Sequence, residues 1–185
     1  MRALVLGGGA GVWDEVLTLE ALLGHQWSEL IVAANDVGAH WPRELHHWCT
    51  LHPQKMKGWM QKRADYGFSN GFVTWGRNVK HCDRSIHEMW PGGSSGLLAV
   101  QVACVVGATH VVLCGVPMTA TPHFRESTEE HIVDGARLWR HADKHWRAWE
   151  RERERLQPIV RSMSGRTRDM LGAPDATWLR ESETP

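Results

Sequence analysis

Two glycine-rich turns in the sequence have the composition of anion-binding loops. Gly7 to Gly11 follows a short apolar run, and Gly92 to Gly96 opens an apolar stretch with a pair of serines. Glycine lets the backbone approach a ligand closely, and the unpaired amides at a helix N-terminus attract phosphate groups. We expect a phosphate-bearing ligand to contact Gly7, Gly8, Gly9, Gly11, Ser94, Ser95 and Gly96.

Polar residues follow three other apolar runs. Asn35 and Asp36 come directly after Leu30–Ala34, His52 follows Trp48–Leu51, and Ser164 and Arg166 follow the last run of the chain. Ligands of open parallel sheets bind outside the carboxyl ends of the strands, so these side chains should meet the glycine-rich turns there. The combined pattern predicts a nucleotide-binding site.

Histidines are numerous, 12 in all, and two of them are candidates for proton transfer. His123 comes shortly after Gly115, where a lid leaving the sheet could hold it over the crevice, and His131 is its rival further along the same segment. Histidine titrates near neutrality and can take a proton from an acceptor hydroxyl. His141 and His145 are four residues apart, but no third ligand has matching spacing, so we expect a solvated helix face and no metal site.

Two familiar nucleotide motifs are incomplete or absent. A dinucleotide fingerprint beginning at Gly7 would need glycine or alanine where the chain has Val12, and a second mononucleotide half of full length is missing. No glycine pair is followed by Gly-Lys-Ser or Gly-Lys-Thr, so a P-loop is absent. The sequence therefore argues against a nicotinamide-dependent enzyme and against a P-loop nucleoside triphosphatase.

The elements expected to position these residues alternate between strands and helices. Apolar runs bounded by glycine or polar residues predict strands, and apolar residues at steps of three and four predict helices. The expected strands are Arg2–Leu6, Leu30–Ala34, Trp48–Leu51, Phe72–Trp75, Val111–Gly115 and Ile159–Ser162. The expected helices cover Val12–Leu23, Gln54–Ala64, Leu97–Val106 and a short segment ending at Leu171, with an irregular connection over Gly76–Pro91. This order predicts a single α/β domain, Rossmann-like, with a mainly parallel sheet and helices on both faces.

A long amphipathic helix is expected over Glu126–Leu156. Its apolar stripe contains Trp139, Trp146 and Trp149, and tryptophan is common in cores and at interfaces. We expect the stripe to pack within the chain or to form a homodimer contact, in a helical lid or arm over residues 118–157. The domain should span residues 1–175, with a mobile tail over 176–185.

Composition narrows the class of protein. The 185 residues carry 21 basic and 21 acidic side chains, which argues against an extended nucleic-acid surface. No apolar run approaches the roughly 20 residues of a membrane span, and the N-terminal apolar run is shorter than a signal sequence needs. We expect a cytoplasmic protein whose four cysteines are free thiols.

The run from Gly92 to Met118, GGSSGLLAVQVACVVGATHVVLCGVPM, resembles a segment of bacterial CMP-sialic acid-dependent sialyltransferases. It is also similar to the corresponding segment of the MptE-like 6-hydroxymethylpterin diphosphokinases. In the sialyltransferases a first-strand glycine loop, an asparagine after the second strand and an Asn-Pro after the third surround the nucleotide. Gly7–Gly11, Asn35 and His52-Pro53 occupy comparable places here, and Ser94, Ser95 and Gly96 match the turn.

The sequence departs from both families at defined positions. His52 stands in place of asparagine, and Pro117 stands where both families have an acidic residue. The tyrosines that hold the leaving phosphate have no equivalents, because Tyr66 is the only tyrosine. The compact size and the irregular relation to both families indicate a phage or mobile-element protein.

Three functions are compatible with these residues. The first is a metal-independent transferase that moves a group from a nucleotide-activated donor, such as a nucleotide sugar, to a hydroxyl acceptor, with no cofactor. The second is a pterin or nucleoside diphosphokinase, which would need Mg²⁺ and has only Asp36 and Asp83 to offer as carboxylates. The third is a protein that binds or sequesters a nucleotide without turnover, which the loss of the acidic residue at Pro117 favours.

Overall fold

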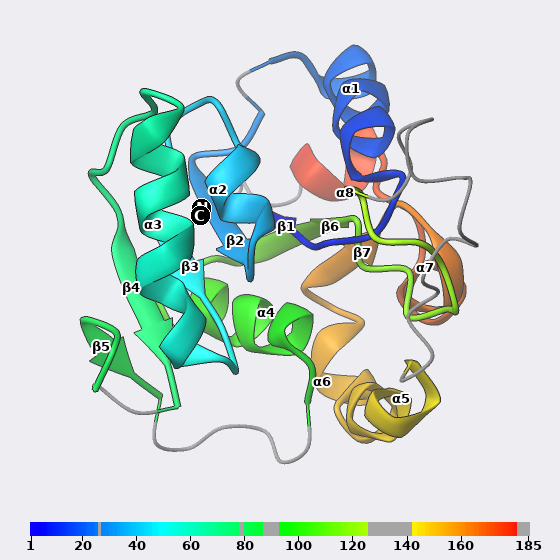
Figure 1. Cartoon of the computed structure of the whole chain (residues 1–185). Coiled ribbons are helices and arrows are strands. Elements are labelled where there is room, and N and C mark those ends of the chain that lie inside the picture. Colours follow the sequence, from blue (N-terminus) through cyan, green and yellow to red (C-terminus); the bar gives the residue numbers. More distant parts are fainter. Residues whose placement is uncertain (26, 78–79, 87–92, 126–141, 181–185) are drawn as a thin grey trace.

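The protein is built around one parallel sheet (Figure 1). The computed structural model describes residues 1–25, 27–77, 80–86, 93–125 and 142–180. In these residues every strand pair is parallel. The seven strands lie side by side in the order β5 (Arg84–Ser85), β4 (Val73–Gly76), β3 (His47–Cys49), β2 (Leu30–Ala34), β1 (Arg2–Leu6), β6 (His110–Cys114) and β7 (Val160–Ser162).

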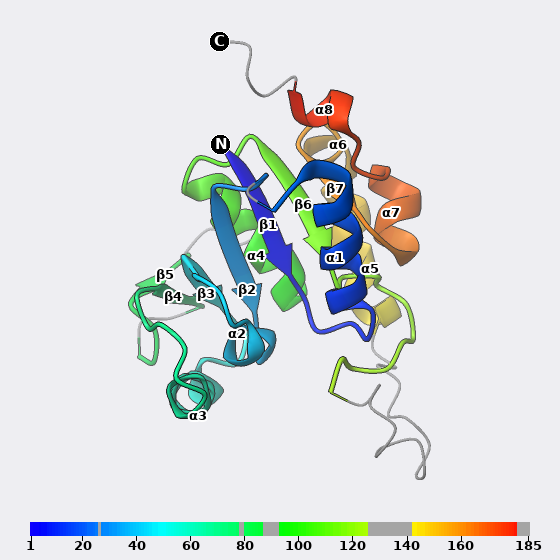
Figure 2. The same cartoon turned by 90° about the horizontal axis from the view of Figure 1, so that it is seen from above.

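The central strand, β1, is where the direction of strand addition reverses. The chain adds β2 to β5 on one side of β1 and then returns through a helix to place β6 on the other side. Figure 2 shows the arrows of β1, β2 and β6 pointing the same way, with α2 (Val37–His40) at the head of β2. This reversal marks the topological switch point of an α/β sheet, where ligand crevices form.

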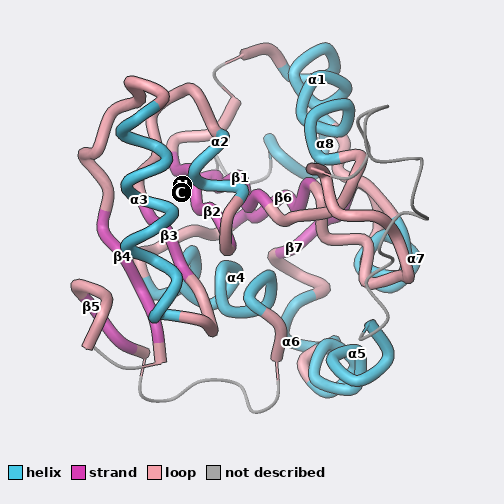
Figure 3. Tube along the Cα trace, in the orientation of Figure 1, coloured by secondary structure: helices cyan, strands magenta, loops and turns pink. Residues whose placement is uncertain are grey.

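Helices cover both faces of the sheet (Figure 3). One face carries α1 (Val12–Leu23), α2, α3 (Met56–Asp65) and α8 (Ala176–Arg180). The other carries α4 (Ser95–Val105), α5 (Ala142–Arg151) and α6 (Arg153–Leu156), and α7 (Gly165–Leu171) packs against β7. A 3-10 turn, η1 (Pro53–Lys55), leads into α3.

Strand residues alternate between the two apolar cores, as the pleat of a sheet requires. On β1, Ala3 and Val5 face the core beneath α4, whereas Leu4 and Leu6 face the core beneath α1. All four side chains are at most 2% exposed. The near-continuous apolar runs in the sequence are therefore strands buried on both faces, and the expected α/β class with a parallel sheet is confirmed.

The structure corrects several expected boundaries. β5 lies inside the stretch predicted to be irregular, because a strand of two residues leaves no periodicity to read. It is held at the sheet edge by Asp83, whose carboxylate accepts hydrogen bonds from the amide and hydroxyl of Thr74 at 2.8 and 2.7 Å. The third strand begins at His47, one residue earlier than predicted, and ends at Cys49, two residues earlier than predicted.

The C-terminal third differs most from the sequence prediction. Of the expected helix Glu126–Leu156, residues 126–141 lie outside the described part of the chain, and the rest forms two helices, α5 and α6, that join at Glu152. Trp146 and Trp149 are 9% and 0% exposed and pack into the chain's own core. The described part of the tryptophan stripe is thus not an exposed surface for a second copy.

The tail predicted to be mobile from residue 176 begins instead with a helix. α8 places Trp178 and Leu179 in the core beneath α1, at 7% and 3% exposure. Arg161 adds to this contact, because its guanidinium lies 4.7 Å from the Trp178 ring. Two apolar residues in a polar tail gave too weak a pattern to predict this helix. Residues 181–185 lie outside the described part of the chain.

Candidate functional site

A cavity of about 440 Å³ lies at the switch point, beyond the carboxyl ends of β1, β2, β3 and β6. This volume is within the range of small-molecule binding sites, roughly 300–1,000 Å³. Its walls come from four loops, the first turn of α4 and one residue of α5. Of the residues predicted to bind a nucleotide or to act as a base, it is lined by Gly7, Gly8, Gly9, Asn35, Asp36, His52, Ser94, Ser95, Gly96 and His123.

Four predicted site residues are not found there. Gly11 precedes α1 and does not line the cavity, and His131 lies outside the described residues. Ser164 and Arg166 also do not line the cavity. Arg166 pairs with Asp143 and stacks over Trp146 at 4.3 Å, because the β7 strand ends at the sheet edge and its loop turns toward α5.

The glycine loop after β1 is shaped by packing as much as by access for a ligand. The amides of Gly7 and Gly9 donate to the carbonyls of Cys114 and Gly115, each at 2.8 Å. A β-carbon on Gly7 would lie 2.4 Å from the Gly115 oxygen, so no side chain fits. These amides hold β1 to β6, and they are therefore not the free phosphate ligands that the sequence predicts.

The segment after β6 folds back over this glycine loop. His123 forms an antiparallel bridge with Gly9, and the Phe124 amide donates to the Gly8 carbonyl at 2.9 Å. Phe124 is 5% exposed, and its ring packs edge-on against those of Trp13 and His40, at 5.6 and 5.2 Å. This anchor fixes the position of His123 at the cavity wall.

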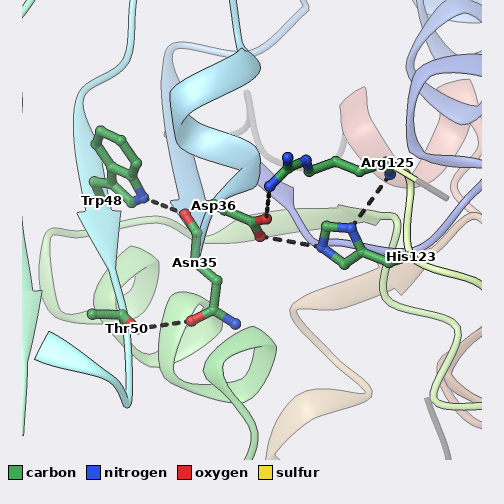
Figure 4. A network of polar contacts seen from close by, with 6 residues as sticks. All are labelled: Asn35, Asp36, Trp48, Thr50, His123 and Arg125. Atoms are coloured by element: carbon green, nitrogen blue, oxygen red, sulfur yellow. Dashed lines mark hydrogen bonds and ion pairs between the residues drawn. The ribbon is translucent and has the colours of Figure 1, made fainter. Parts of the chain in front are cut away.

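His123 and Asp36 form a hydrogen bond across the carboxyl edge of the sheet (Figure 4). His123 Nε2 lies 3.1 Å from Asp36 Oδ1, and the Arg125 guanidinium lies 3.8 Å from Oδ2. Burial by itself raises the pKa of Asp36, but the hydrogen bond and charge of His123, with the charge of Arg125, outweigh burial and leave the pKa below its ordinary value. Asp36 is therefore ionised at neutral pH.

This pairing determines which nitrogen of His123 is basic. A carboxylate only accepts hydrogen bonds, so Nε2 carries the proton in the neutral ring and Nδ1 is the acceptor. Nδ1 accepts the Arg125 amide hydrogen at 3.3 Å, at the long end of hydrogen-bond distances. Gly8 must lack a side chain here, because a β-carbon would lie 2.9 Å from Nε2.

The opposite wall, at the N-terminus of α4, presents hydrogen-bond donors. Ser94 caps the helix, and its oxygen accepts from the Leu97 amide at 3.3 Å and from the Trp149 indole at 3.2 Å. A hydroxyl has two lone pairs and one proton, so Ser94 is left with only its proton to offer. Within the described residues, that proton's one acceptor is the Met118 sulfur at 3.9 Å, a weak one. Ser95 Oγ likewise accepts the Leu51 amide hydrogen at 3.2 Å.

Four residues near this cavity were missed or misread in the sequence. His145 lines the cavity, although it was assigned to a solvated helix face, because α5 packs beside the first turn of α4. Trp149 reaches Ser94 from the same helix. Thr50 and Arg125 carry no motif, and only the fold brings them to Asn35 and Asp36 (Figure 4).

No group of three or more His, Cys, Asp or Glu side chains comes together as a metal site in the described part of the chain. None of the described helices has the length and apolar character needed to cross a membrane. Comparisons of the chain with models of known protein families, with characterised proteins and with solved structures give no match. The residues of the cavity are therefore the basis for assigning a function.

Proposed function

We propose that the cavity binds a nucleotide-activated donor and that the protein transfers the activated group to a hydroxyl acceptor, without a metal ion. The observation that carries this proposal is that two walls of the cavity differ in chemistry. One wall holds Ser94, which has only its hydroxyl proton left to offer, together with the Ser95 hydroxyl, and the other wall holds the Asp36–His123 pair.

The donor wall suits the phosphate of the ligand. The first amides of a helix have no partner within the helix, and its dipole favours an anion there. Hydrogen bonds to a charged acceptor are stronger than those between neutral groups. Ser94 has both lone pairs occupied by Leu97 and Trp149, so its hydroxyl favours an acceptor-rich group such as phosphate over a hydrogen-bond donor.

The paired histidine suits the acceptor. With Nε2–H held by Asp36, Nδ1 of His123 takes the proton of the acceptor hydroxyl. The freed oxygen forms a bond to the transferred group, and the bond between that group and the phosphate oxygen breaks. Its electron pair leaves with the nucleotide, whose added negative charge the donors of α4 stabilise.

A second function, nucleotide binding without turnover, is favoured by one contact. His123 Nδ1 already accepts the Arg125 amide hydrogen, so a substrate hydroxyl must displace that contact before proton transfer. A protein that only sequesters a nucleotide would keep this bond.

The test is a thermal-shift panel of ribonucleoside monophosphates and nucleotide sugars, each with and without Mg²⁺. A ligand present at 100 times its dissociation constant adds about 2.7 kcal/mol, which raises the melting midpoint of a chain this size by about 5–10 °C. We expect a shift that does not need Mg²⁺. The proposal fails if no compound shifts the midpoint, and binding without transfer to any hydroxyl acceptor supports the second function.

Ser95→Ala separates phosphate recognition from general binding. Alanine is well tolerated at the first position of a helix, so α4 should still form, while the hydroxyl that donates to the ligand and accepts from the Leu51 amide is lost. We expect the variant to bind the monophosphate about tenfold more weakly and the matching nucleoside with little change. Ser69→Ala, in the exposed loop between α3 and β4, is the matched control. Equal weakening of nucleoside and monophosphate would contradict the assignment of phosphate to α4.

A further inference from the structure

Asn35, directly after β2, is held in one conformation by its backbone. Its φ of 60° lies in the left-handed region, which asparagine adopts more readily than most residues. The Asn35 amide donates to the Cys49 carbonyl at 2.9 Å, and the Trp48 indole donates to the Asn35 carbonyl at 2.5 Å. With both backbone polar groups bonded to β3, the direction of the side chain is fixed.

Thr50 determines which end of the Asn35 amide faces the cavity. Thr50 is 0% exposed, and its Oγ1 accepts the His52 amide hydrogen at 2.8 Å. Oγ1 also lies 2.8 Å from Asn35 Oδ1 and has no other side-chain partner among the described residues. If the amide were turned round, the buried hydroxyl proton would have no acceptor, which costs about 1–3 kcal/mol. The proton is therefore donated to Oδ1.

This orientation turns the Asn35 nitrogen away from Thr50, as Figure 4 shows. Asn35 lines the cavity, and its Nδ2 has no hydrogen-bond partner in the part of the chain that the structure describes. The next residue is Asp36, which is ionised at neutral pH and disfavours a second anion beside it. The group that meets Nδ2 should therefore be a neutral hydrogen-bond acceptor.

We infer that Asn35 Nδ2 recognises a carbonyl oxygen or an unprotonated ring nitrogen on the nucleobase of the ligand, and that Thr50 is the positioning residue that presents this donor. The inference rests on the proposed function, because it names the part of the nucleotide that lies at the end of β2. It assigns the phosphate to α4 and the nucleobase to Asn35.

The decisive variant is Asn35→Asp. Aspartate has nearly the same shape, tolerates the left-handed backbone and still accepts from Thr50, but it replaces the donating nitrogen with an oxygen. The probes are adenosine, guanosine, cytidine and uridine, each as nucleoside and as monophosphate, measured by calorimetric titration. We expect the tightest probe to bind at least about tenfold more weakly in both forms, because two acceptors now face each other.

Two Thr50 variants test the positioning role. Thr50→Ser keeps the hydroxyl and should preserve affinity within about twofold, whereas Thr50→Val removes it and lets the amide turn. We expect Thr50→Val to reduce the ratio of affinities among the four nucleosides. A purely structural role would lower the melting midpoint of the unliganded protein and leave this ratio unchanged.

The outcomes separate the inference from the proposed function. If no probe binds the wild type, the proposed function fails, and the inference fails with it. If probes bind but Asn35→Asp binds them equally well or more tightly, the ligand donates a hydrogen bond there and only the inference is overturned. If Asn35→Asp weakens the monophosphate alone, Asn35 belongs to the phosphate site, which also overturns the inference.

Discussion

Asp36→Asn tests the hydrogen bond between Asp36 and His123 at the edge of the cavity. Asparagine can still accept the His123 Nε2 hydrogen through its oxygen, so the substitution removes the charge and keeps the hydrogen bond. Hydrogen bonds to charged groups contribute about 1.5–3 kcal/mol to stability, against about 0.5–1.5 kcal/mol for neutral pairs. Asp36 is 18% exposed and His123 is 33% exposed, and screening by water keeps the difference near the lower end, about 1 kcal/mol.

This loss should lower the melting midpoint at pH 7 by roughly 2–4 °C for a domain of this size. The effect depends on pH with a defined sign. The pKa of Asp36 in the folded state lies below its ordinary value of 3.8, so its ionisation stabilises the fold above that pH. This stabilisation is lost as the pH falls from 3.8 through the folded pKa, and wild type and variant should converge there.

The assay is scanning calorimetry of wild type and Asp36→Asn between pH 3 and pH 8. Asp65→Asn is the matched control, since Asp65 is an exposed residue of α3 that accepts a hydrogen bond from Gln61. Its midpoint should stay close to that of the wild type at every pH. The reasoning is refuted if Asp36→Asn melts like the wild type at pH 7, or if its deficit persists unchanged at pH 3.

Two other predictions concern groups behind the site. Burial raises the pKa of Glu15 above 4.5 although its carboxylate accepts the Gly115 amide hydrogen at 2.7 Å, so ionising it costs stability as the pH rises through and above 4.5. In urea unfolding, Glu15→Gln should gain stability relative to wild type between pH 4 and pH 7, and a constant difference would contradict this sign. Arg63 is 0% exposed and donates to the carbonyls of two buried residues, Gly38 at 2.9 Å and Trp41. Arg63→Met should lower the free energy of unfolding by about 3 kcal/mol or more in the same assay, because buried carbonyl oxygens lose their hydrogen-bond donor. A loss under about 1 kcal/mol would show that these hydrogen bonds do not stabilise the fold.

The order of elements was readable from the sequence where the signal is local. β1, β2 and α1 have the predicted bounds, because a run of apolar residues ending at glycine or Asn-Asp is visible within a short window. The serine turn before α4 was likewise predictable, since Ser94 is a preferred helix-capping residue. The two-residue strand β5 and the five-residue helix α8 were not predicted, because their stability comes from partners elsewhere in the chain.

The sequence by itself determined that the glycine turns, Asn35-Asp36, His52 and the serine pair gather at one edge, since parallel strands all end on the same side. Only the tertiary structure determines which hydrogen-bond partners these residues have. The pairing of Asp36 with His123 joins residues 87 positions apart, and the Trp149 contact to Ser94 joins residues 55 apart. Hydrogen-bond roles depend on which partner lies within about 3 Å, and no spacing along the chain specifies that distance.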